Sequence, residues 1–115
     1  MQFYEKLIFL FNLTQVTNRM LATELKVDPS LISRLRTGTR GIPRNKEQIK
    51  AMSSFFAKRC TTQYQRQALS GMLGIRQALT MKKDLLTEVL YYWLCGETDE
   101  VGRFIRTFET LSIED

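Results

Sequence analysis

Apolar residues recur along this 115-residue chain at intervals of three and four, the spacing of one buried helix face. Polar runs, glycines and prolines divide this pattern into segments of helical length. The pattern predicts helices over residues 2–13, 18–25, 29–37, 45–60, 62–73, 80–95 and 98–111. No alternating apolar and polar stretch indicates a strand. The chain is therefore predicted to be all-α, with about seven helices.

Capping residues mark the ends of the second and third predicted helices. Thr17 suits the N-cap of the helix over 18–25, and Asp28 suits the N-cap of the helix over 29–37. Pro29 then takes the first helical position, where a missing N–H costs nothing. Gly38 stands at the expected C-terminal stop. Residues 17–38 therefore predict two short helices joined by a tight turn.

The remaining segments suggest two units. Residues 38–46 are predicted to form a loop, because two glycines and a proline fall within them. The helix over 62–73 is predicted to bury Tyr64, Ala68, Leu69 and Met72. A weak boundary follows near residues 74–80. We therefore expect a helical domain over residues 1–75 and a helical extension over residues 76–115.

Charge is unevenly distributed along the chain. Residues 1–79 contain thirteen Lys/Arg and four Asp/Glu, a net charge of +9, whereas residues 80–115 contain four Lys/Arg and eight Asp/Glu, a net charge of −4. A strongly basic region favours a surface that faces nucleic acid. The acidic last third is expected to serve another purpose.

Several kinds of chemistry are disfavoured by the composition. The chain has no histidine, which is the commonest general base and zinc ligand, and Cys60 and Cys95 match no metal-binding spacing. It contains neither a GxGxxG nor a GxxxxGK[ST] phosphate loop. We therefore expect no enzyme activity, no metal and no cofactor. Without a signal peptide or an apolar run near the roughly 20 residues that span a bilayer, the expected location is the cytoplasm.

Residues 17–38 also satisfy the packing needs of a helix-turn-helix. Ala22 allows the two helices to approach closely, Val27 fills the turn, and Ile32 and Leu35 anchor the second helix. The residues that this arrangement leaves on the outer face of the second helix, or at its edge, are Pro29, Ser30, Leu31, Ser33, Arg34 and Thr37.

The stretch resembles the helix-turn-helix of the Cro/C1-repressor-type transcriptional regulators, also called the XRE-like family. The residues that fit the family pattern are Thr17, Leu21, Ala22, Leu25, Val27, Ile32, Ser33, Arg34, Gly38, Arg40 and Pro43, followed by Ile49, Ser53 and Phe56. The resemblance covers roughly residues 3–73 and implies a five-helix DNA-binding domain. Asn18 replaces the usual Gln, and Asp28 and Pro29 replace the usual start of the recognition helix.

The resemblance implies that the helix over 29–37 lies in the major groove of double-stranded DNA. Arg34 could pair with a guanine or hold a phosphate, and Leu31 could meet a thymine methyl group or pack inside the domain. The residues implied at the DNA are Thr17, Asn18, Ser30, Leu31, Ser33, Arg34, Thr37, Arg40, Arg44 and Lys46. An alternative use of the same fold is protein–protein contact without a specific operator.

The helices beyond residue 75 need an explanation of their own. Their apolar stripes can pack on each other and on the domain. They can also form a homodimer, which would place two recognition helices one DNA turn apart, about 34 Å. The residues predicted for such an interface are Leu86, Leu90, Tyr91, Trp93, Phe104 and Phe108. A third possibility is a docking site for a further domain or a peptide effector.

Overall fold

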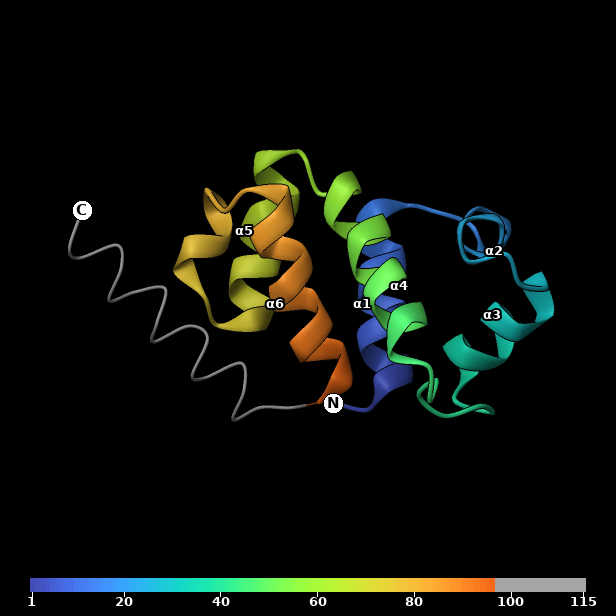
Figure 1. Cartoon of the computed structure of the whole chain (residues 1–115). Helices are drawn as coiled ribbons and strands as arrows, with labels where there is room; N and C mark the ends of the chain where they lie inside the picture. The colour runs from blue at the N-terminus through green and yellow to red at the C-terminus, as the bar shows by residue number, and fades with distance from the viewer. Residues whose placement is uncertain (97–115) are drawn as a thin grey trace.

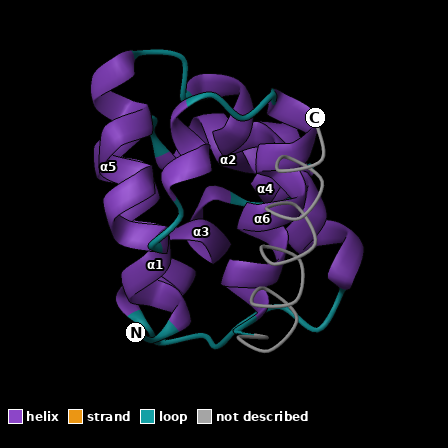
Figure 2. Ribbon diagram, turned by 90° about the vertical axis from the view of Figure 1, so that its left-hand side faces the viewer, coloured by secondary structure: helices purple, strands orange, loops and turns teal. Residues whose placement is uncertain are grey.

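The computed structural model describes residues 1–96, which form six α-helices and one 3₁₀ turn (Figure 1). They are α1 (Phe3–Thr14), α2 (Asn18–Leu25), α3 (Pro29–Thr37), α4 (Lys46–Arg59), α5 (Gln63–Leu73), the 3₁₀ turn η1 (Arg76–Leu79) and α6 (Lys83–Cys95). These residues contain no strand (Figure 2), so the all-α class is confirmed for this part of the chain. The predicted helix over 98–111 lies outside the described residues.

Side-chain caps fix the starts of α2 and α3 where the sequence predicts them. Thr17 Oγ1 accepts a hydrogen bond from the Met20 N–H at 3.2 Å, and Asp28 Oδ1 accepts one from the Ser30 N–H at 2.8 Å. Gly38 ends α3 with a φ of 80°, a left-handed conformation that glycine adopts readily. The bounds of both helices are therefore confirmed.

The start of α6 differs from the prediction. The helix begins at Lys83 rather than Thr80, because η1 occupies the residues just before it. The Thr80 N–H donates to the Gln77 carbonyl at 3.1 Å and closes the 3₁₀ turn. The link between η1 and α6 is thus only a few residues long.

The most extensive helix contact in the described residues joins α4 and α6, which run antiparallel. Lys46 Nζ lies 3.8 Å from Cys95 Sγ at one end, and Lys50 Nζ lies 3.3 Å from the Glu88 carboxylate further along. In Figure 1, α2 and α3 lie at one end of the molecule and α5 at the other. α1 and α4 occupy the middle, so they connect the helix-turn-helix to the rest of the fold.

A single apolar core runs through all six helices. Its fully buried side chains include Leu7, Leu10, Leu21, Ile32, Ile49, Met52, Phe56, Leu69, Leu86 and Leu90. The core therefore continues across the predicted boundary between residues 75 and 76, and α6 is part of it.

Two residues predicted for a dimer interface belong to this core. Leu86 and Leu90 are each 0% exposed within the single chain, so they offer no surface to a partner. Trp93 is half-buried by α1: Lys6 Nζ donates to its carbonyl at 2.6 Å, and the Phe9 ring meets its indole edge-on, with 6.2 Å between ring centroids. The apolar stripe of α6 is thus satisfied mainly inside the protein.

A clamp formed by one arginine attaches α5 to the neighbouring loops. Tyr64 and Met72, both predicted to be buried, are 75% and 37% exposed, because α5 is covered on one side only. The half-buried Arg66 guanidinium instead donates to the carbonyl oxygens of Cys60 at 2.7 Å, Ala78 at 3.0 Å and Met81 at 2.6 Å. The Cys60 carbonyl directly follows α4, the Ala78 carbonyl lies in η1, and the Met81 carbonyl lies just after η1. Arg66 therefore joins α5 to the end of α4 and to the segment around η1.

Cys60 gives the stability of the fold a dependence on pH. Burial raises the pKa of its thiol to about 11, against the opposing effect of the Arg66 charge. In the unfolded chain a thiol loses its proton near pH 8.5. The unfolded state therefore binds fewer protons between these values, and we expect the free energy of unfolding to fall by about 2–3 kcal/mol as pH rises from about 9 to about 11.

Chemical unfolding of Cys60→Ala and Cys95→Ala over this pH range tests the assignment. Only Cys60→Ala should remove the fall. Burial lowers the pKa of Lys6, against the opposing effect of the Cys95 charge, so Lys6 contributes with the opposite sign. This contribution is the same in the parent chain and Cys60→Ala and is larger in Cys95→Ala, so the decisive comparison is that of Cys60→Ala with the parent chain. Parallel pH profiles for Cys60→Ala and the parent chain would show that Cys60 is not the source.

Candidate nucleic-acid interface

The outer face of α3 is polar and open to solvent. Ser30, Ser33, Arg34 and Thr37 are all exposed, whereas Ile32 is 0% and Leu35 is 1% exposed on the opposite side. The helical repeat therefore divides α3 into an anchored face and a presented face, as the sequence predicts. Leu31 lies between them and is half-buried.

Arg34 is the cationic group at the centre of the presented face. Its side chain is exposed, and its guanidinium forms no hydrogen bond or ion pair with other described residues. The nearby Asp28 carboxylate caps α3, and its pKa is lowered chiefly by the hydrogen bonds from Ser30 and in smaller part by the charge of Arg34. The carboxylate thus stays ionised at the start of α3, which disfavours a phosphate at that point.

The start of α2 is organised by Arg36, a residue that sequence reasoning assigned no role. Its guanidinium stacks over the Phe11 ring, with Cζ 4.1 Å from the centroid, and donates to Asn18 Oδ1 at 2.8 Å. Because the amide oxygen accepts this bond, the Asn18 amide N–H groups are directed away from Arg36. Thr17 Oγ1 accepts the capping hydrogen bond from the Met20 N–H, so its hydroxyl hydrogen and the Asn18 amide are both left to donate to a phosphate.

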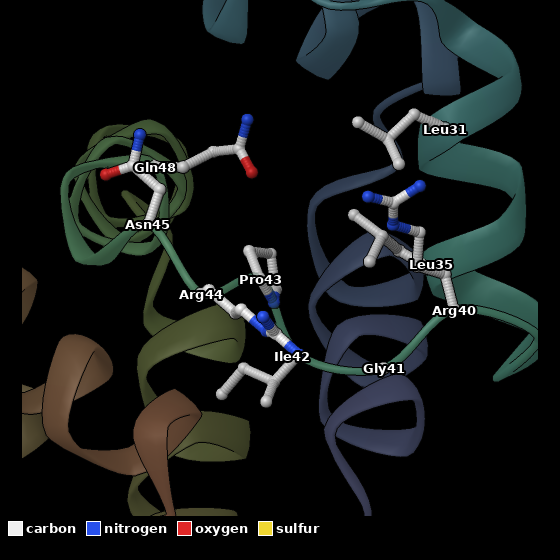
Figure 3. A pocket seen from close by; sticks show the side chains of 9 residues that line it. All are labelled: Leu31, Leu35, Arg40, Gly41, Ile42, Pro43, Arg44, Asn45 and Gln48. Atoms are coloured by element: carbon white, nitrogen blue, oxygen red, sulfur yellow. The ribbon is translucent and has the colours of Figure 1, made fainter.

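A cleft of about 730 Å³ separates α3 from the start of α4 (Figure 3). Leu31, Leu35 and Pro43 form its apolar walls. Arg40 and Gln48 extend into it from opposite sides, whereas Arg44 lies along the loop toward Ile42 (Figure 3). The first turn of α4 therefore contributes a polar side chain, Gln48, that the sequence analysis missed, although its place after a basic loop could have indicated it.

The other predicted residues have partners inside the fold. Thr37 Oγ1 donates to the Arg34 carbonyl at 3.2 Å and lies 3.0 Å from Thr39 Oγ1. Lys46 is directed toward Cys95 at the end of α6. The structure therefore brings Ser30, Ser33, Arg34 and Thr37 to the exposed side of α3, whereas it directs Lys46 toward the end of α6.

Basic charge surrounds this surface. Residues 17–46 contain seven Lys/Arg and only two Asp/Glu, Glu24 and Asp28. Arg34, Arg40 and Arg44 are exposed, and none forms an ion pair with another residue of the range 1–96. Such a field attracts polyanions and raises their rate of association.

Two further observations concern other kinds of site. Residues 1–96 contain no group of three His, Cys, Asp or Glu side chains arranged to hold a metal ion. None of their helices has the length and apolar character needed to cross a membrane. Of the predicted interface residues, Tyr91 is half-exposed on α6 beside Lys50, and Phe104 and Phe108 lie outside the described residues.

Comparison with family models, curated proteins and solved structures finds no match to this chain.

The shape of the loop that carries Arg40 and Arg44 depends on Gly38. A Cβ atom at this glycine would lie 3.0 Å from Tyr4 Cδ1, and its φ of 80° is strained for any other residue. We expect Gly38→Ala to lower the free energy of unfolding by about 1–2 kcal/mol. Gly41→Ala is the matched control, because nothing lies within 4 Å of its Cβ position. Urea unfolding measures both, and equal losses would contradict this role of Gly38.

Proposed function

We propose that this protein binds double-stranded DNA selectively by sequence and acts as a transcriptional regulator. The observation that carries the proposal is the presented face of α3, on which Arg34 and two serines stand open to solvent over a buried apolar anchor. An α-helix fits the major groove of B-DNA, where each base pair shows a distinct set of donors and acceptors. α3 is therefore the proposed recognition helix.

Each exposed group has a role in this proposal. Arg34 pairs with O6 and N7 of a guanine, since a guanidinium can donate two parallel hydrogen bonds. Ser30 and Ser33 meet base edges or phosphates near it. Arg40 and Arg44 hold the sugar-phosphate backbone and fix the register of α3, and the Asn18 amide does the same at the start of α2.

A homodimer belongs to the same proposal, because two copies could present two α3 helices to successive major grooves. Leu86 and Leu90 are buried within one chain. Within residues 1–96, the proposed dimer interface would therefore be formed by partly exposed side chains such as Tyr91.

Selection of bound duplexes from a random pool tests whether a sequence preference exists, and a palindromic product supports the dimer. On the selected duplex, Arg34→Ala should cost about 1–3 kcal/mol and relax the preference at one base pair. A loss that is equal for all sequences would instead make Arg34 a phosphate contact. Lys58→Ala on α4 serves as control, because this exposed lysine lies at the end of α4 remote from α3.

If no sequence is enriched, and weak binding shows only a shallow salt dependence, the competing function gains support. In that case the helix-turn-helix serves protein–protein contact.

A further inference from the structure

The two arginines in the last turn of α3 have different surroundings. Arg34 is exposed, whereas Arg36 is half-buried. The Arg36 guanidinium covers the Phe11 ring, with Cζ 4.1 Å from the centroid, and Phe11 itself is only 2% exposed. A guanidinium stacks favourably on the face of an aromatic ring. Arg36 is therefore held in place by a ring of the core.

The same guanidinium sets the orientation of the Asn18 carboxamide. Arg36 Nη1 donates to Asn18 Oδ1 at 2.8 Å, and this bond joins the last turn of α3 to the first residue of α2. A carboxamide can present either its oxygen or its NH₂ group to a neighbour, but an arginine has donors only. Arg36 therefore selects the orientation in which the oxygen faces it and the NH₂ group is left for another partner.

The selected orientation is the one that a contact with DNA needs. In the proposed complex Asn18 meets a backbone phosphate, whose oxygens accept hydrogen bonds from amide donors. The opposite orientation would turn the carboxamide oxygen toward the phosphate and lose the bond. A donor that is already oriented in the free protein also avoids the cost of ordering it on binding.

From these contacts we infer that Arg36 is a positioning residue for DNA binding. It holds the Asn18 NH₂ group toward a phosphate without touching the DNA itself. Because Arg36 belongs to α3, the proposed recognition helix also fixes the backbone anchor at the start of α2. This inference rests on the proposed function and assigns a role to a residue outside the DNA-facing surface.

A double-mutant cycle separates this role from a general effect of charge or packing. Fluorescence anisotropy measures the affinity of the parent chain, R36M, N18A and N18A/R36M for the selected duplex. We expect R36M and N18A each to weaken binding about three- to tenfold, and R36M to add less than about twofold in the N18A background. R59M is the matched control, because the half-buried Arg59 also stacks on a buried ring, that of Phe55, at the end of α4 remote from α3. Its affinity should stay within about twofold of the parent value.

A second variant, R36Q, tests the selection itself. Glutamine has both a donor and an acceptor, so it can pair with either orientation of Asn18. R36Q should therefore weaken binding in the parent background and add less than about twofold in the N18A background. If circular dichroism shows that R36M is unfolded, the cycle with R36Q decides.

Three outcomes would overturn the inference. They are an unchanged affinity of the Arg36 variants, an equal loss in the parent and N18A backgrounds, and a slope of log K against log salt that becomes shallower by about 0.9, which marks a direct phosphate contact of Arg36. Each of these refutes the positioning role while the parent chain still binds the duplex. If the parent chain binds no duplex, the proposed function fails, and this inference fails with it.

Discussion

Replacing Arg34, Arg40 and Arg44 together with glutamine should weaken DNA binding by at least on the order of 100-fold at physiological salt. In the proposed complex Arg40 and Arg44 each neutralise a phosphate, which releases condensed counterions. The slope of log K against log salt should therefore become shallower by about 1.8 for these two contacts, about 2 kcal/mol of binding free energy at about 0.15 M salt. Loss of the base contact of Arg34 adds about 1–3 kcal/mol.

Fluorescence anisotropy of a labelled duplex between about 50 and 200 mM salt measures both the affinity and the slope. The matched control is K58Q/R76Q/K82Q, which removes the same net charge from exposed positions. Because α4 and α6 are antiparallel, Lys58 and Lys82 lie at the end of this pair remote from the α3–α4 loop. Equal losses in the two triple variants would mean that only net charge matters, and the proposed face would be wrong.

Local features of this fold follow directly from the sequence. The caps Thr17, Asp28 and Gly38 act within two or three residues of their own position, so the bounds of α2 and α3 could be predicted. The presented face of α3 could also be predicted from the sequence, because helical periodicity alone separates Ser33 and Arg34 from the buried anchors.

Features that depend on which elements meet could not be predicted in this way. The apolar stripe of α6 shows that one face needs covering, but it does not say whether α4 or a second chain covers it. The hydrogen bond between Arg36 and Asn18 joins residues eighteen positions apart, and it forms only because α2 and α3 pack against each other. In the candidate site, Gln48 was missed for the same reason, since the cleft forms only when α3 and α4 are in place.

The hydrogen bonds of Arg66 also depend on which elements meet, and they are expected to contribute more to stability than any other interaction discussed. Arg66→Met should lower the free energy of unfolding by about 3–5 kcal/mol, because charge-assisted hydrogen bonds contribute about 1.5–3 kcal/mol each and two guanidinium nitrogens, Nε and Nη1, serve the three carbonyls. Methionine keeps the apolar length of the side chain, so the change isolates the guanidinium. Against a typical stability of about 5–15 kcal/mol, such a loss is large.

The matched control for Arg66→Met is Arg59→Met. Arg59 is also half-buried, but it donates to a single carbonyl, that of Phe55 in its own helix at 2.9 Å. Its guanidinium also stacks on the Phe55 ring, with Cζ 3.7 Å from the centroid. We therefore expect Arg59→Met to cost about 1.5–3 kcal/mol in urea unfolding, less than Arg66→Met. Equal losses in the two variants would show that the clamp across three segments adds nothing beyond one ordinary contact.

Hydrogen exchange distinguishes a global loss of stability in Arg66→Met from local opening of η1. Two of the three carbonyls lie in or just after η1, so release of the clamp can free that turn while α1–α4 stay folded. The amides of Ala78 and Thr80 donate to the Ile75 and Gln77 carbonyls. These two amides should exchange faster in Arg66→Met than in the parent chain, by a larger factor than the amides of α4. Faster exchange confined to α4 would contradict the assignment, because it would place the role of Arg66 in the central helix rather than in the link that leads to α6.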